Sequence, residues 1–182
     1  RLIKWKGHEF GIRAVSELIN RGYKVSYEII GEGEEKENLL QMIKERNLEN
    51  TVRLPGIRDQ HYIRNAMQRS DLFLMTSTHD NEGRRETQGV VTGEAQACGL
   101  PVCAFNSGGV PYTLIDGETG FLSEENDYLD MATNIEKLIV DPELRNKMAI
   151  KARQFIVENY SLEISAAKMQ AIYQKLQKPV LA

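Results

Sequence analysis

The stretch GVVTGEAQACGLPVCAF, residues 89–105, places a helix-forming segment directly before a strand-forming one. Residues 89–98 predict an amphipathic helix, and residues 101–105 are an apolar run of the length typical of a buried strand. Another short apolar run, residues 71–76, precedes the helix. Strand, helix and strand in this order are typical of a unit whose strands lie parallel in one sheet.

The same alternation continues toward both ends of the chain. Upstream, we expect strands at residues 1–3, 24–30 and 51–54 and helices at residues 7–21, 34–47 and 59–69, with Gly22 as a C-cap. Downstream, we expect a turn at 116–120, a last strand at 121–122, and helices at residues 128–140, 142–159 and 162–178, with Ser161 as an N-cap. The sequence therefore predicts one α/β domain over residues 1–182, a Rossmann-like doubly wound parallel sheet with a C-terminal helical tail.

Composition is typical of a folded, soluble domain. Of the 182 residues, 41% are hydrophobic and 27% charged, which is enough for a substantial core. The net charge of -3 comes from interspersed acids and bases, so nucleic acid is not an expected partner. We expect Cys98 and Cys103, the only cysteines, to be buried thiols in a reducing compartment. No apolar run approaches the roughly 20 residues of a membrane span, and the abrupt start at Arg1 suggests a piece of a longer polypeptide.

Ligands of such sheets bind where the strands end, so residues just after strands are the candidates. Arg1 and Lys6 flank the end of the first expected strand, and two cations beside a helix N-terminus suit a diphosphate, although they could also be solvated surface charges. The long polar segment 76–89 holds Glu86 and leads into the helix that holds Glu94. Glu94, leaning back toward this segment, could accept the two hydroxyls of a ribose or simply complement the helix dipole.

Two glycine pairs leave alternatives open. Gly31 and Gly33 permit either the close approach of a ligand or a tight turn. Four acids there (Glu32, Glu34, Glu35 and Glu37) suit a helix N-terminus and argue against an NAD site, because they would repel a phosphate. Gly108 and Gly109 form either an anion-binding nest or an ordinary turn.

No metal site is expected. The histidines His8, His61 and His79 are scattered, and the sequence has no Asp-x-Asp pair to hold a divalent ion on a diphosphate. A diphosphate site in this chain must then be metal-independent and rely on arginine and lysine.

Together these motifs resemble the C-terminal, donor-binding domain of family 4 retaining glycosyltransferases, one half of their GT-B fold. The resemblance rests on the segments 1–2, 6–7, 31–33, 97–102, 108–109 and 116–122 and on the pair Glu86-x7-Glu94. It covers nearly the whole chain, and the segment 6–9 is similar to the colanic acid and exopolysaccharide branch.

The resemblance implies a role for each candidate residue. Arg1 and Lys6 would neutralise the donor diphosphate as the leaving-group charge develops. Glu86 would hold the transferred hexose and Glu94 the ribose, while the base would lie at Gly56 and Ile57. The other expected donor-binding residues are Gly31, Gly33, Gly56, Ile57, Thr87, Gln88, Gly89 and Val90, those around Gln88 and Gly89 through backbone amides.

The implied activity is transfer of a hexose from a UDP- or GDP-sugar, with retention and with no cofactor or metal, to a glycan or lipid-linked acceptor in exopolysaccharide or lipopolysaccharide biosynthesis. The acceptor would bind the family's N-terminal domain, which these residues lack, so we expect this chain alone to bind donor weakly and to transfer no sugar. The implied location is cytoplasmic, with peripheral contact at the inner membrane as an option for the full-length protein.

This chain departs from the family pattern at two places. Tyr112 replaces the commoner acid after Gly108-Gly109-Val110-Pro111, and Arg84-Arg85 precedes Glu86 where apolar residues are commoner. Two other functions remain as alternatives: a nucleotide-sugar epimerase of the same fold, and a non-enzymatic α/β ligand-binding module. An epimerase would convert its donor without any acceptor.

Overall fold

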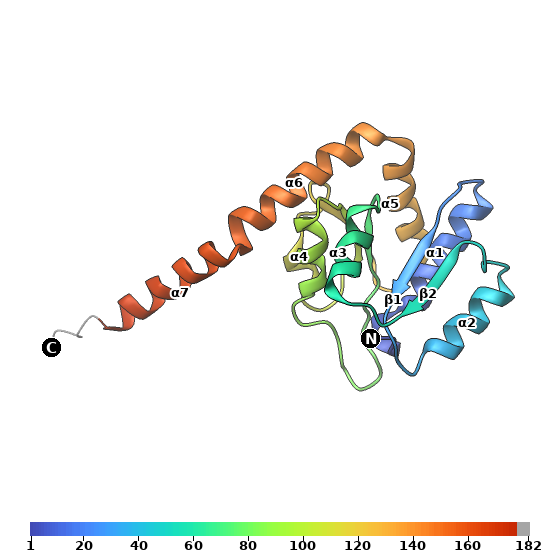
Figure 1. Cartoon of the computed structure of the whole chain (residues 1–182), viewed down its shortest axis with the longest axis horizontal. Coiled ribbons are helices and arrows are strands. Elements are labelled where there is room, and N and C mark those ends of the chain that lie inside the picture. Colours follow the sequence, from blue (N-terminus) through green and yellow to red (C-terminus); the bar gives the residue numbers. More distant parts are fainter. Residues whose placement is uncertain (178–182) are drawn as a thin grey trace.

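Short strands alternate with helices along residues 1–177, the part of the chain that the computed structural model describes (Figure 1). The strands are β1 (Tyr27–Ile30), β2 (Val52–Gly56), β3 (Phe73–Met75), β4 (Val102–Phe105) and β5 (Gly120–Ser123). The helices are α1 (His8–Asn20), α2 (Lys36–Glu45), α3 (Gln60–Gln68), α4 (Val90–Ala97), α5 (Tyr128–Val140), α6 (Pro142–Tyr160) and α7 (Leu162–Gln177), with 3-10 turns η1 (Lys4–Lys6) and η2 (Val110–Thr113). The predicted α/β class is confirmed.

The helix ends follow from local side-chain chemistry. The carboxylate of Asp59 accepts a hydrogen bond from the backbone N–H of Tyr62 at 2.7 Å and so caps α3. Ser161 caps α7 as expected, since its hydroxyl oxygen accepts from the N–H of Ile164 at 3.3 Å. Gly22, just beyond α1, has a φ of 91°, which is the left-handed conformation expected of a glycine that ends a helix.

All strand pairings within residues 1–177 are parallel, but they form two sheets where one was expected. β1 pairs with β2, and β4 lies between β3 and β5. A cavity of about 760 Å³, called here the central cavity, lies between β1 and β3 and is lined by residues 24–30 and 70–77 from the two sides.

The strand predicted at residues 1–3 is absent from the structure. The N–H of Leu2 donates to the carbonyl of Glu32 at 2.8 Å, and the carbonyl of Leu2 accepts from the N–H of Glu35 at 3.0 Å. These bonds attach the segment to the loop that follows β1, and η1 begins at Lys4. Residues 1–3 therefore have no ladder of backbone hydrogen bonds, although Leu2 is fully buried as an apolar residue should be.

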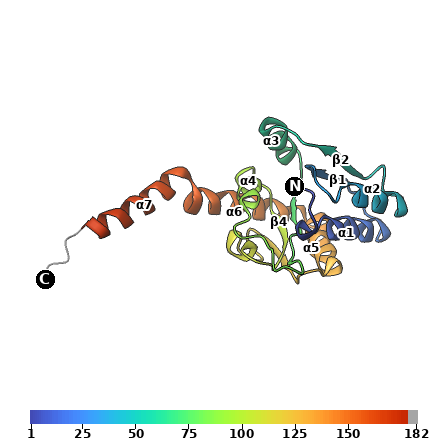
Figure 2. The ribbon, with the colours of Figure 1, turned by 90° about the horizontal axis from the view of Figure 1, so that it is seen from below.

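Helices cover both faces of the strands, as a doubly wound fold requires (Figures 1 and 2). On one face α1 and α5 pack over β4, where the buried Leu18, Phe105 and Met131 form one cluster. On the other face, Met67 of α3 and Ala95 of α4 pack with Leu100. Each fully buried large apolar side chain contributes roughly 1.5–3 kcal/mol to folding, so these clusters hold the helices against the strands.

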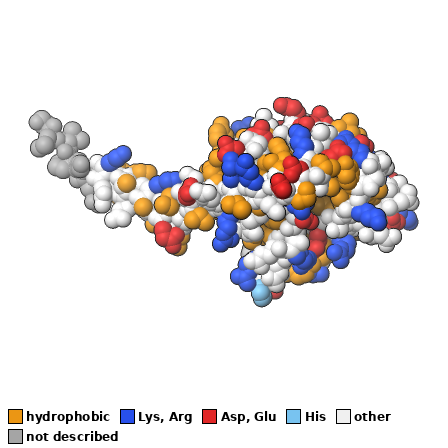
Figure 3. Space-filling view, turned by 90° about the horizontal axis from the view of Figure 1, so that it is seen from above, with side chains coloured by type: hydrophobic (Ala, Val, Ile, Leu, Met, Phe, Trp, Pro, Cys, Tyr) orange, Lys and Arg blue, Asp and Glu red, His pale blue; other side chains and the backbone are white. Residues whose placement is uncertain are grey.

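The C-terminal helical tail is confirmed as far as Gln177; Lys178, with which the predicted helix ended, lies outside the described residues. Figures 1 and 2 show α7 extending away from the rest of the chain. It exposes the apolar side chains of Leu162, Met169, Ile172, Tyr173 and Leu176. Figure 3 shows hydrophobic side chains along this tail. Across residues 1–177, no helix combines the length and apolarity that crossing a membrane requires.

Candidate functional site

The central cavity brings together groups from distant parts of the sequence. Arg1, Lys6 and Glu94 all line it, and the end of β3 supplies Thr76 and Ser77. The expected diphosphate cations and the expected ribose carboxylate thus face one hollow and are not scattered over separate surfaces.

Lys6, which lines this cavity, is fixed by backbone contacts around it. The N–H of Thr78 donates to the carbonyl of Trp5 at 2.8 Å, and the hydroxyl of Thr76 donates to the carbonyl of Lys6 at 3.0 Å. Gly7, with a φ of 61°, is needed here because a Cβ at this position would lie 2.0 Å from the carbonyl oxygen of Thr76. The turn that carries Lys6 is therefore attached to the end of β3.

Lys6 and Glu86 form an ion pair across 80 positions of sequence. The side chain of Glu86 is only 14% exposed. Burial alone would raise the pKa of Glu86, but hydrogen bonds from Lys6 and from the backbone N–H groups of Gly89 and Gln88 outweigh it and hold that pKa below its ordinary value. The carboxylate is therefore ionised at neutral pH, and the amides expected to orient a hexose point at it.

Gly108 and Gly109 position the segment that carries Glu86. A Cβ on Gly108 would lie 2.2 Å from the carbonyl oxygen of Glu86, and one on Gly109 would lie 1.9 Å from that of Thr87. The N–H of Gly109 donates to the carbonyl of Glu86 at 2.8 Å. The two glycines therefore allow the backbone of their turn to approach that of residues 86–87 closely. The N–H of Gly109 already has a hydrogen-bond acceptor within the chain.

Gly33 also serves a contact within the chain, since a Cβ there would lie 2.2 Å from the carbonyl oxygen of Leu2. Gly31 donates its N–H to the carbonyl of Gly56 at 3.1 Å, which joins the ends of β1 and β2. Ile57, the next residue, is 72% exposed. Gly56 and Ile57, where the base was expected, therefore lie beside Gly31 at the strand ends.

The acids after β1 were expected at a helix N-terminus, and the structure confirms this for Glu35, the N-cap residue of α2, and for Glu37, in its first turn. The expectation was wrong for Glu32, because α2 begins only at Lys36. Glu32 pairs instead with Lys36 at 2.8 Å, and its Oε1 lies 2.9 Å from where a Cβ on Gly56 would be. Glu32 therefore belongs to the turns at the strand ends and contributes negative charge there.

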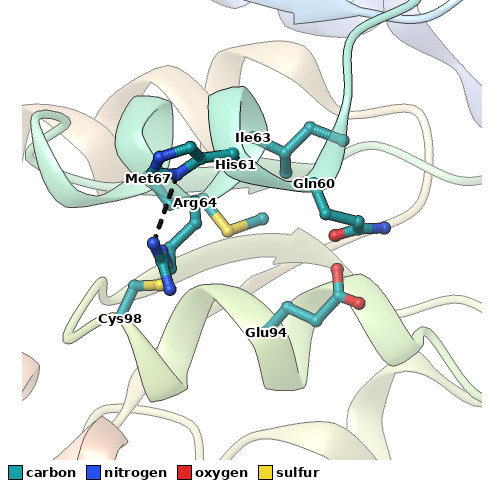
Figure 4. Close-up of a pocket in the computed structure, with 7 residues that line it drawn as sticks. All are labelled: Gln60, His61, Ile63, Arg64, Met67, Glu94 and Cys98. Atoms are coloured by element: carbon teal, nitrogen blue, oxygen red, sulfur yellow. Dashed lines mark hydrogen bonds between the residues drawn. The ribbon is translucent and has the colours of Figure 1, made fainter.

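Glu94 lies on α4 and also borders a second pocket of about 480 Å³ between α3 and α4. Figure 4 shows its carboxylate directed across this pocket toward Gln60, while His61 and Arg64 lie at the other end of the pocket, on the side of Cys98. Cys98, expected to be buried, is only partly so and lines the same pocket, whereas Cys103 is buried. Glu94 thus has open space on two sides and is exposed to solvent.

The remaining donor-binding candidates surround Glu86. Gly89, with a φ of 62°, is the residue before α4, and a Cβ on it would approach the side chain of Glu86 at 3.7 Å. Thr87, Gln88 and Val90 are exposed around it.

Sequence reasoning missed two polar groups of the site. Ser77, 1% exposed, has a hydroxyl without a hydrogen-bond partner among the described residues, and it lines the central cavity. Its position directly after β3 was the signal that could have identified it. His79 contacts Glu125, 46 positions away, and nothing in the sequence pattern connects the two.

Within residues 1–177, no three His, Cys, Asp or Glu side chains are grouped as metal ligands would be. His61 lies beside Arg64 and His8 beside the carbonyl of Arg1. Tyr112, where the family pattern has an acid, is 81% exposed, and its carbonyl accepts a hydrogen bond from the hydroxyl of Tyr160 at 3.1 Å.

Comparison with known proteins identifies relatives over nearly the whole chain. The pattern that defines the family "Glycosyl transferases group 1" matches residues 1–155. An alpha-D-kanosaminyltransferase of Streptomyces kanamyceticus is 30% identical over 176 residues, which cover 97% of this chain and 44% of that protein. A protein of Salmonella typhimurium, assigned provisionally to colanic acid biosynthesis as the glycosyltransferase WcaL, is 25% identical over 177 residues, with the same two coverages.

Among solved structures, Anabaena HepE in complex with UDP-glucose is similar with a TM-score of 0.83 and 27% identity, over 96% of this chain and 47% of that one. The chain thus spans about half the length of these relatives. The predicted resemblance, including its colanic acid branch, is confirmed.

Proposed function

Because the chain belongs to the glycosyl transferases group 1 family, we propose that it is the donor-binding half of a retaining hexosyltransferase that uses a nucleoside-diphosphate sugar. The observation that carries the proposal is the meeting of Arg1, Lys6 and Glu94 around the central cavity, with Glu86 paired to Lys6. Cations suit a diphosphate, and carboxylates suit the hydroxyls of a ribose and a hexose.

The Lys6–Glu86 pair gives donor binding a defined first step. A diphosphate offers Lys6 more negative charge than one carboxylate does, so Lys6 turns to the phosphates when donor enters. Glu86, still held by the N–H of Gly89 at 3.1 Å, then accepts hydrogen bonds from the hexose hydroxyls. As the glycosidic bond breaks, Lys6 and Arg1 stabilise the charge that develops on the leaving diphosphate, with no metal ion required.

The names of the relatives favour transfer over the alternatives. Both relatives described above are named as transferases, which supports transfer rather than epimerisation or a non-catalytic role. The full-length enzyme would bind a glycan or lipid-linked acceptor outside this chain, in the cytoplasm at the inner membrane, for the synthesis of exopolysaccharide or lipopolysaccharide. HepE with UDP-glucose supports a UDP-sugar as the first donor to test.

Calorimetry and thermal unfolding test the proposal on this chain. UDP-glucose, GDP-mannose and ADP-glucose are screened for stabilisation, which reaches about 2.7 kcal/mol when ligand is at a hundred times its Kd. Lys6→Ala removes a charge-assisted bond and should weaken binding roughly tenfold or more. Glu94→Gln should weaken binding of the nucleotide through its ribose.

Lys4→Ala is the matched control, because Lys4 is an exposed lysine of the same turn η1. It should bind like the parent. If Lys6→Ala and Glu94→Gln also bind like the parent, the site assignment is wrong.

A further inference from the structure

The segment that carries Glu86 is attached to the rest of the chain by a network of hydrogen bonds centred on Glu125. Glu125 follows β5, and one of its carboxylate oxygens accepts from the backbone N–H of His79 at 2.6 Å. The other oxygen accepts from the ring Nδ1–H of His79 at 2.7 Å. Ser107, which follows β4 and is 2% exposed, lies 3.3 Å from the same ring nitrogen. Three loops at the strand ends therefore meet at one carboxylate.

The contacts around His79 indicate which of its two ring nitrogens carries the hydrogen. Nδ1 donates to Glu125, and on the far side of the ring Nε2 lies 3.3 Å from a guanidinium nitrogen of Arg85. Because arginine can only donate, Nε2 must be the unprotonated acceptor. These two contacts therefore fit the tautomer of His79 that carries its hydrogen on Nδ1.

The tip between His79 and Arg85 is ordered by itself. Asp80 accepts hydrogen bonds from the backbone N–H groups of Glu82 and Arg84 at 2.9 and 2.8 Å and from the side chain of Arg84 at 2.6 Å. The N–H of Asp80 also donates to the carbonyl of Arg84 at 3.1 Å, which closes the turn through the backbone. Because the tip is a closed turn, fixing its two ends fixes the position of the residue that follows Arg85, which is Glu86.

We propose that Glu125 is a positioning residue: by fixing His79, and through it Arg85, it holds Glu86 where the donor hexose is received. This inference rests on the proposed function only for what Glu86 does. The attachment itself is a property of the free chain. The charged groups that face His79 are Glu125 from the turn after β5 and Arg85 from its own loop, while the charge of Asp80 beside it is paired with Arg84.

The attachment is tested first without donor, by amide hydrogen exchange on the chain. Glu125→Gln keeps the size of the side chain and removes its charge, and Glu124→Gln alters the neighbouring exposed carboxylate as a matched control. We expect protection of the amides of residues 79–89 to fall roughly tenfold in Glu125→Gln, as for loss of a hydrogen bond to a charged group, and to stay unchanged in Glu124→Gln.

One further readout separates positioning from general loosening. In a His79→Gln background, Glu125→Gln should have a smaller effect than in the parent, because the two residues act through one contact. Unchanged protection in Glu125→Gln, or fully additive effects, would overturn the proposal.

Calorimetry with UDP and UDP-glucose then tests the connection to Glu86. Glu125→Gln should reduce the ratio of UDP-glucose affinity to UDP affinity and leave UDP itself within about twofold, because only the hexose contacts Glu86. Equal losses for both ligands would overturn the positioning role. If neither ligand nor the GDP equivalents bind the parent, the proposed function fails, while hydrogen exchange still decides the attachment.

Discussion

Gly109→Ala offers the sharpest test of how the site is assembled. At Gly109 the backbone has a φ of -89°, which alanine adopts without strain, so the effect of the substitution is purely steric. The added Cβ would lie 1.9 Å from the carbonyl oxygen of Thr87 and 2.6 Å from its carbonyl carbon. The segment 86–88 must retreat by roughly 1.5 Å to restore ordinary contact, and the hydrogen bond from Gly109 to the carbonyl of Glu86 is then lost.

The expected change in the free energy of unfolding follows from the steric clash and the lost hydrogen bond. Forcing a methyl group into a packed contact costs about 1–3 kcal/mol, and the lost backbone hydrogen bond adds about 0.5–1.5 kcal/mol. We therefore expect Gly109→Ala to lower the free energy of unfolding by about 2–4 kcal/mol, which lowers the Tm by roughly 5–15 °C in a domain of this size. Donor binding should weaken as well, because Glu86 moves with the segment.

Urea and thermal unfolding measure this difference, with Gly93→Ala as the control. Gly93 is inside α4, and a Cβ there would meet only the Cδ1 of Ile156, at an ordinary 3.7 Å. That substitution should stabilise the chain by about 0.5–1 kcal/mol through helix propensity. Equal stability of the two alanine variants would refute the packing of Gly109 on Thr87.

Further predictions concern charge, thiols and a second close contact. The pKa of Glu86 is lowered in the folded chain, so its carboxylate stabilises the fold fully above about pH 4.3, its unfolded pKa. This contribution is lost as the pH falls through the lowered pKa. Urea unfolding of the parent and of Glu86→Gln from pH 7 to 3 should therefore show a difference in the free energy of unfolding that shrinks only at the acid end. Burial raises the pKa of Cys103 to about 12, so at pH 8 a thiol reagent should modify Cys98 in the native chain and Cys103 only after unfolding. Gly11→Ala should be destabilising, because a Cβ there would lie 2.6 Å from the hydroxyl of Tyr27, and Tyr27→Phe in the same chain should restore part of the lost stability.

The acids after β1 show how far a local interpretation holds. A run of glutamates before an amphipathic segment predicts a helix N-terminus, and Glu35 and Glu37 lie at one, but α2 begins only at Lys36 and leaves Glu32 outside it. For residues 1–3, the local pattern predicted a strand that is absent from the structure. Their apolar character predicts burial, which Leu2 confirms, but a strand also needs a partner edge, and local spacing does not specify one.

The sequence by itself determined the order of strands and helices, the C-terminal end of α1 and the N-terminal end of α7. Side-chain periodicity and capping at Gly22 and Ser161 act over a few neighbouring residues. The sequence also identified Arg1, Lys6, Glu86 and Glu94 as candidate site residues, and the resemblance to a family assigned a role to each. Only the tertiary structure decided that Lys6 pairs with Glu86, that Gly109 packs on Thr87, and that Glu125 holds His79. These contacts join loops that are distant in sequence, and they depend on where parallel strands bring their carboxyl ends together.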